Sequence, residues 1–151
     1  MLDPKSLNWE ILEQLRDDAK PEDRFTEYKL LLPSGTDESK REFLADVSAF
    51  ANASGGTIFY GIEENEGKIA NIPGLSGFVE DLEVRRLEQI LASNIDPKLW
   101  GVEFRVLRPP AGEPVLAVSI PSSWRRPHMV TFKNLSRFFI RTQKGREQLD
   151  V

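Results

Sequence analysis

The chain has 151 residues, of which 40% are hydrophobic and 29% are charged, and its formal net charge is −4. This length suits one domain with its own core, and the absence of cysteine excludes disulfides, thiolate zinc sites and cysteine nucleophiles. No apolar run approaches the ~18 residues of a membrane-spanning helix, and no secretory signal pattern opens the sequence. We therefore expect a cytoplasmic protein that does not bind membranes.

The first two predicted elements are a helix and a strand. Residues 3–20 predict a helix, because Pro4 suits an early helical position and apolar residues recur on one face. Residues 25–33 predict a strand that ends at Pro33.

The clearest predicted helix covers residues 36–54. Thr36 suits the N-cap, and acidic residues follow in the first turn, where the helix dipole favours them. Gly55 and Gly56 end the helix, since a left-handed turn is easiest for glycine. The nearly all-apolar residues 56–62 then predict a strand in the middle of a sheet.

The rest of the chain predicts one more helix and several strands. They cover residues 68–72 (strand), 81–95 (helix), 101–109, 114–121, 128–132 and 137–142 (strands), with the last two joined as a hairpin through 133–136. Helices and strands mix without strict alternation, so we expect an α+β fold in which helices pack on a mixed β-sheet. We divide this single domain into an N-terminal helix, residues 1–20, and a main part, residues 21–151.

Three charged residues near the predicted first strand are candidates for a site. Glu27 and Lys29 share one face of that strand, whereas Glu22 can join them only if the chain turns between Glu22 and Glu27. An ordinary surface salt bridge is the alternative interpretation. Glu63 and Glu64 follow the buried strand and would lie at an edge of the sheet, where sites often form, although a polar hairpin tip has the same sequence.

Charge is unevenly distributed along the chain. Residues 121–151 have a net charge of +5, and the remaining 120 residues have a net charge of −9. The basic residues of this segment are Arg125, Arg126, Lys133, Arg137, Arg141, Lys144 and Arg146. They predict a basic stripe for phosphates, with an aromatic side chain available for stacking; a polar tail or a half-buried edge strand is the alternative. We interpret His128 as a structural histidine.

The stretch AFANASGGTIFYGIEE, residues 49–64, resembles the AlbA_2 domain of Schlafen-like proteins, which is called a DNA-binding domain in bacteria. EYK precedes it and NIPGL follows it, and the resemblance continues through IDPKLWGVEF, PVLAVSIP and RFFIRTQKG. It covers the chain from about Glu22 to Lys144. The resemblance implies a mixed sheet flanked by helices.

The resemblance also implies a role for the acidic residues. Schlafen nucleases carry two glutamates before a lysine and a third acid after the glycine-glycine strand, and these acids form a metal-dependent site that cuts structured RNA. Glu22, Glu27 and Lys29 match the first part, and Glu64, or alternatively Glu63, matches the third acid. Such carboxylates would hold Mg²⁺ or Mn²⁺. This chain departs from the pattern by having glutamate where the nucleases have aspartate, and longer family members carry further segments.

Three functions follow from these observations. The first is a nucleic-acid-binding module for DNA or RNA, as part of a larger regulator or defence protein. The second is a divalent-metal-dependent endoribonuclease with Glu22, Glu27 and Glu64 as ligands and Lys29 as electrostatic support. The third is a protein-interaction domain, for example in a homodimer.

Overall fold

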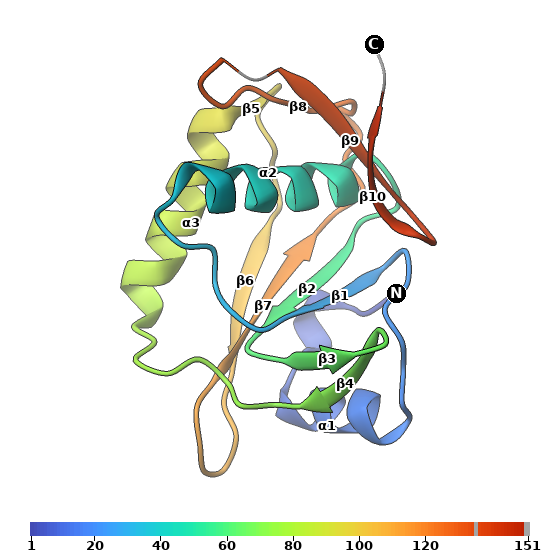
Figure 1. Ribbon diagram of the computed structural model, residues 1–151, viewed down its shortest axis with the longest axis vertical. Coiled ribbons are helices and arrows are strands. Elements are labelled where there is room, and N and C mark those ends of the chain that lie inside the picture. The colour runs from blue at the N-terminus through green and yellow to red at the C-terminus, as the bar shows by residue number, and fades with distance from the viewer. Residues whose placement is uncertain (135, 150–151) are drawn as a thin grey trace.

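The computed structural model describes residues 1–134 and 136–149, and a four-stranded sheet lies at its centre (Figure 1). In spatial order its strands are β1 (Thr26–Lys29), β2 (Gly56–Tyr60), β7 (Val115–Ile120) and β6 (Glu103–Leu107). β1 is parallel to β2, and the other neighbours are antiparallel. The mixed sheet is as predicted, and β2 lies inside it with every residue buried, as its apolar sequence indicates.

Two helices cover one face of this sheet. They are α2 (Asp37–Ala51) and α3 (Glu80–Asn94). Phe43, Val47 and Phe50 of α2 recur at helical spacing and join one core with Ile58 of β2 and Leu116 of β7. Burial of this apolar stripe stabilises α2 more than helix propensity does. The helices and the sheet together confirm the predicted α+β architecture.

The N-terminal end of α2 forms where the sequence predicts it, whereas the helix ends at Ala51, three residues before the predicted end at residue 54. The Thr36 hydroxyl accepts a hydrogen bond from the backbone N–H of Ser39 at 3.2 Å, so it caps the first turn. At the other end the backbone N–H of Gly55 donates to the Phe50 carbonyl at 2.9 Å, with Gly55 at a φ of 76°. Among residues 1–134 and 136–149, no helix is both long and apolar enough to cross a bilayer.

A second, smaller sheet packs against α2 (Figure 1). In spatial order its strands are β10 (Gly145–Leu149), β9 (Arg137–Thr142), β8 (Met129–Val130) and β5 (Ile95–Asp96), all antiparallel to their neighbours. Val130 and Phe139 of this sheet pack into the core that contains Phe50 and Ile58. Helix α2 is therefore in contact with both sheets.

The second sheet differs from the sequence prediction in two strands, β10 and β5, whose Ile95 was predicted to end a helix. The antiparallel pairing of β8 with β9 confirms the predicted hairpin; its connection, residues 133–136, includes Leu135, which lies outside the described residues. Strand β10 was not predicted. Its sequence, GREQL, has no apolar alternation, and four of its five residues are exposed, so only the pairing with β9 reveals it as a strand.

The N-terminal segment covers the opposite face of the central sheet. It contains a 3-10 turn, η1 (Pro4–Ser6), and helix α1 (Trp9–Asp17), and the hairpin β3 (Glu63–Asn65) and β4 (Lys68–Asn71) lies beside it (Figure 1). Leu7 and Leu12 are buried in one cluster with Phe59 of β2. The prediction of one continuous helix was wrong, because the Asn8 side chain accepts a hydrogen bond from Ile11 N at 2.9 Å and starts a new helix.

Strand β1 is also shorter than predicted. The backbone N–H groups of Gly61 and Ile62 both donate to the carbonyl of Lys29, at 2.8 and 2.9 Å, so pairing with β2 ends there. The following residues leave the sheet, and the Leu31 side chain is 74% exposed.

The packing of Leu12 predicts a measurable contribution to stability. Leu12→Ala should lower the free energy of unfolding by about 2–5 kcal/mol, because it leaves a cavity between α1 and the sheet. Urea unfolding monitored by circular dichroism measures this change. Leu82→Ala is the matched control, since Leu82 is an exposed leucine on α3 and should change stability by less than about 0.5 kcal/mol. Equal effects of the two substitutions would contradict the packing described here.

Candidate functional site

The chain turns before β1 and brings Glu22 back beside the strand. Its carboxylate accepts a hydrogen bond from the backbone N–H of Tyr28 at 2.9 Å, and its own N–H donates to the Gly67 carbonyl at 2.7 Å. The turn itself is closed by Asp23, whose carboxylate accepts from Phe25 N at 2.8 Å. Burial raises the pKa of Glu22, and the nearby carboxylates of Glu27 and Glu64 raise it further, against the lowering effect of the Tyr28 N–H.

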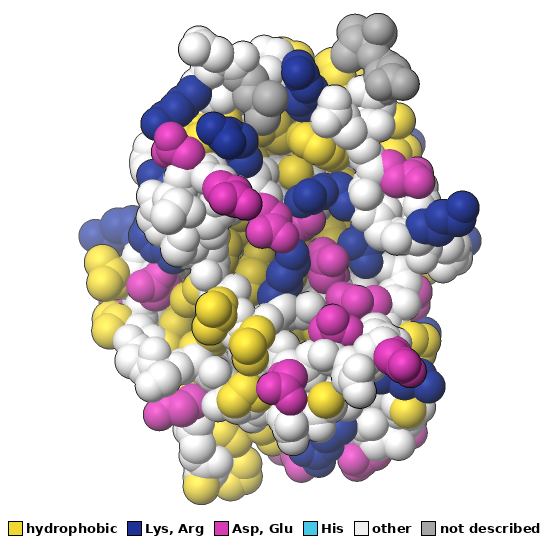
Figure 2. Space-filling model, viewed as in Figure 1, with side chains coloured by type: hydrophobic (Ala, Val, Ile, Leu, Met, Phe, Trp, Pro, Cys, Tyr) yellow, Lys and Arg dark blue, Asp and Glu magenta, His cyan; other side chains and the backbone are white. Residues whose placement is uncertain are grey.

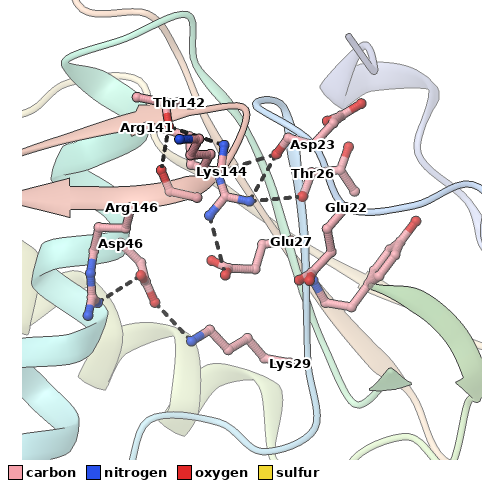
Figure 3. Close-up of polar contacts among 12 residues, drawn as sticks. Glu22, Asp23, Thr26, Glu27, Lys29, Asp46, Arg141, Thr142, Lys144 and Arg146 are labelled. Carbon is pink, nitrogen blue, oxygen red and sulfur yellow. Dashed lines mark hydrogen bonds and ion pairs between the residues drawn. The ribbon is translucent and has the colours of Figure 1, made fainter. Parts of the chain in front are cut away.

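Glu27 and Lys29 share the face of β1 that looks toward α2, as predicted (Figure 3). Glu27 Oε1 lies 3.3 Å from Arg141 Nη1. Lys29 Nζ lies 3.0 Å from Glu42 Oε1 and 3.2 Å from Asp46 Oδ2, both on α2. Burial alone would lower the pKa of Lys29, but the surrounding carboxylates outweigh it and raise that pKa. Lys29 is therefore held as a cation between two elements.

Arg141 of β9 lies at the centre of this arrangement (Figure 3). Only 6% of the residue is exposed. Its Nη2 donates to the carbonyls of Asp23 at 2.9 Å and Thr26 at 3.3 Å, and its guanidinium carbon lies 4.8 Å from the centre of the Phe50 ring. Arg141 was predicted to belong to a basic stripe for phosphates, whereas the structure turns it inward to contact β1.

Asp46 is a member of the site that the sequence analysis missed. It is 4% exposed, with Oδ1 2.9 Å from Arg146 Nη1 of β10 and Oδ2 3.2 Å from Lys29 Nζ. Burial raises the pKa of Asp46 to about 6; the Glu27 carboxylate raises it as well, and Lys29 and Arg146 lower it. The only sequence signal for it is a carboxylate three residues after Phe43, on the apolar stripe of α2, and that signal does not identify the cations it pairs with. We call Glu27, Lys29, Asp46, Arg141 and Arg146 the charge cluster.

The acids at the tip of the β3–β4 hairpin have local partners. Glu64 Oε2 accepts from Gly67 N at 2.8 Å, and Glu63 Oε1 accepts from the Asn71 side-chain amide at 2.9 Å; both glutamates are exposed. Glu64 is near enough to Glu22 to raise its pKa. In the part of the chain that the structure describes, no group of three or more His, Asp or Glu side chains could hold a metal ion. The Mg²⁺ or Mn²⁺ set of Glu22, Glu27 and Glu64 stays a prediction.

The predicted basic residues fall into two groups. Arg141 and Arg146 bind acids of the charge cluster, and Lys133 Nζ lies 2.6 Å from Asp37 Oδ2. The remaining four are exposed and form no ion pair with any described carboxylate; they are Arg125, Arg126, Arg137 and Lys144. Figure 2 shows basic and acidic side chains intermingled over α2 and the β9–β10 hairpin. The free cations therefore belong to the second sheet and the loop before it.

His128 is buried, in line with its interpretation as a structural histidine. Its Nδ1 lies 2.7 Å from the Pro97 carbonyl and its Nε2 lies 2.6 Å from Ser123 Oγ. Because a carbonyl only accepts, Nδ1 carries the proton and Nε2 accepts from Ser123. Asn52 completes the group: its Oδ1 accepts from His128 N at 2.7 Å and its Nδ2 donates to the carbonyls of His128 and Phe139. We call Asn52, Ser123 and His128 the histidine support.

Comparison with known families identifies the domain. The family described as Schlafen, AlbA_2 matches residues 22–150. The chain belongs to the Schlafen AlbA_2 family. The match starts close to the predicted division at residue 20, while Leu7 and Leu12 join the N-terminal segment to the same fold. No curated protein matches the chain.

Two solved structures share the fold of this AlbA_2 domain. One is the N-terminal domain of a RecG-related protein from Nitrosomonas europaea, with a TM-score of 0.62 and 20% identity, over 94% of this chain and 92% of that one. The other is the DIP2311 protein from Corynebacterium diphtheriae, with a TM-score of 0.57 and 19% identity, over 92% of this chain. This chain spans 29% of the length of DIP2311.

The raised pKa of Asp46 predicts how stability depends on pH. Between pH 4 and pH 6 the folded state holds a proton that the unfolded state has lost, so this group's contribution to stability falls as pH rises. The free energy of unfolding of the native protein, relative to that of Asp46→Asn, should fall by about 2–3 kcal/mol between pH 4 and pH 7. Urea unfolding of both proteins at each pH measures the difference, in which the titration of groups distant from Asp46 cancels. A difference independent of pH would contradict the buried ionisation.

The contacts of Arg141 predict a large loss of stability when its charge is removed. Arg141→Met should lower the free energy of unfolding by about 3–5 kcal/mol, because the Glu27 carboxylate and two backbone carbonyls lose their donor. Adding Glu27→Gln should recover part of this loss. Arg137→Met, an exposed position on the same strand, is the matched control and should have little effect.

Proposed function

We propose that this AlbA_2 domain binds nucleic acid, DNA or RNA, through the exposed cations of its second sheet and the loop before it. One observation carries the proposal. Although the formal net charge of the chain is −4, four cations are exposed and form no ion pair with any described carboxylate. They are Arg125, Arg126, Arg137 and Lys144. Such cations release counterions from phosphates when they bind, and this release supplies most of the sequence-independent affinity for nucleic acid.

Family membership and the RecG-related neighbour support the same proposal. The neighbour's name relates it to an ATP-dependent DNA helicase, RecG. In a longer protein, a domain of this kind would hold the nucleic acid while other segments act on it. That arrangement is part of the proposal, as is a role in a regulator or defence protein.

The charge cluster is a poor place for phosphates. Arg141 and Arg146 already contact Glu27 and Asp46, and the phosphate would meet those carboxylates as well. We therefore assign the cluster to the fold and the phosphate contacts to the outer cations. The ribonuclease hypothesis has no preformed metal site among the described residues to support it, and the homodimer stays a prediction that the mass in solution tests.

The proposal predicts a specific change in salt dependence. The double substitution Arg137→Gln and Lys144→Gln should reduce the slope of log affinity against log salt by about two, one for each lost phosphate contact. Fluorescence anisotropy with a labelled DNA duplex and a labelled RNA hairpin, over a series of salt concentrations, measures the slope.

The control makes the same change in total charge elsewhere. Arg16 and Arg108 pair with acids on α1 and α3, and replacing both by Gln should leave the slope unchanged. Glu27→Gln should also leave binding intact. Absence of binding by the native domain, or equal slopes in the two double variants, would contradict the proposal.

A further inference from the structure

Two tryptophans are among the most exposed large apolar side chains of the domain. Trp124 is 87% exposed and Trp100 is 67% exposed. Side chains of this size normally bury most of their area, so two on neighbouring loops indicate a contact surface. They lie on residues 97–102 and 121–127, which we call the tryptophan loops.

The tryptophan loops run side by side. His128 joins them, since its ring nitrogens lie 2.7 Å from the Pro97 carbonyl and 2.6 Å from Ser123 Oγ. The two loops also come close next to Trp100, where a Cβ built on Gly101 would be 3.2 Å from Pro121 Cγ. The backbones that carry the two tryptophans are thus fixed relative to each other.

The C-terminal end of α2 holds the second loop in place. Ser123 N donates to the Ala51 carbonyl at 3.0 Å, and Ser122 Oγ donates to the Ala53 carbonyl at 2.7 Å. A Cβ on Gly55 would lie 2.7 Å from Ile120 O and from Ser122 N, so only glycine permits this approach. Residues 49–56, AFANASGG, therefore contain the end of α2 and also form a rigid base that holds the exposed loop 121–127.

The exposed part of the loop 121–127 combines an aromatic ring with cations. The guanidinium carbon of Arg125 lies 5.8 Å from the centre of the Trp124 ring. Arg126 is fixed by donating from Nη1 to the Ser123 carbonyl at 2.9 Å, and exposed Lys98 adds a charge on the other loop. An exposed indole can stack on any nucleobase, while guanidinium groups beside it contact the phosphates on either side.

We propose that the tryptophan loops bind single-stranded nucleic acid by stacking unpaired bases on Trp124 and Trp100, with Arg125 and Arg126 contacting the backbone. This inference rests on the proposed nucleic-acid function and adds the strandedness of the ligand. A duplex covers the faces of its internal bases, so stacking on exposed indoles favours a strand whose bases are free. The rigid base limits the ordering that binding would otherwise require.

The test compares two ligands across matched variants. Trp124→Ala and Trp100→Ala should each weaken binding of a labelled oligothymidylate by about ten- to a hundredfold, the range of one stacked base. Binding of a blunt DNA duplex should change less than about twofold, since phosphate contacts carry it. Leu31→Ala, which truncates an exposed leucine on another loop, should change neither. In the native domain, oligothymidylate should quench tryptophan fluorescence, and Trp124→Phe should keep the affinity but lose part of the quenching.

Each other outcome has a definite meaning. If the native domain binds duplex and strand alike and the tryptophan variants bind both normally, this inference is overturned and the proposed function stands. If the native domain binds neither ligand, both are overturned. If Trp124→Ala changes only the mass in solution, the surface is a protein interface and the inference fails. Urea unfolding of each variant shows whether it is folded, and a folded variant that loses both ligands equally also overturns stacking.

Discussion

The buried guanidinium of Arg141 is the constraint on which the arrangement of the two sheets depends. It belongs to the second sheet, donates to two carbonyls and a carboxylate around β1, and lies over Phe50 of the helix between them. A buried cation needs such partners, since desolvation without them costs far more than a hydrogen bond returns. The turn before β1, the side chain of Glu27 and the position of β9 are therefore mutually fixed.

Helix α2 connects this constraint to the outer surface. Asp46, in its middle, contacts Lys29 of β1 and Arg146 of β10, and Asn52, at its end, contacts His128 and Phe139. One rigid element thus carries both the charge cluster and the histidine support. Four exposed cations lie beyond these contacts and form no ion pair with any described carboxylate, namely Arg125, Arg126, Arg137 and Lys144.

The sequence predicted what local chemistry determines. Thr36, the apolar stripe through Phe43 and Phe50, and Gly55 define α2 by capping, periodicity and backbone freedom, which need no distant partner. The sequence could not show which arginine of β9 is buried, because Arg137 and Arg141 lie on the same strand and differ only in the elements that face them. Asp46 was missed because a carboxylate on an apolar stripe becomes meaningful only when its cations, from β1 and β10, are in place. Strand β10 was not predicted for a similar reason, because only its pairing with β9 makes it a strand.

The contacts of Glu22 and Arg141 have one more consequence, for behaviour at high protein concentration. β1 is an edge strand, and edge strands expose amide and carbonyl groups on which a foreign strand can add. Here Glu22 accepts from the Tyr28 N–H, and Arg141 donates to the Thr26 carbonyl, so charged side chains of the same chain already occupy these groups. These contacts leave fewer free backbone groups on β1 for a foreign strand, and so disfavour extension of the central sheet at that edge.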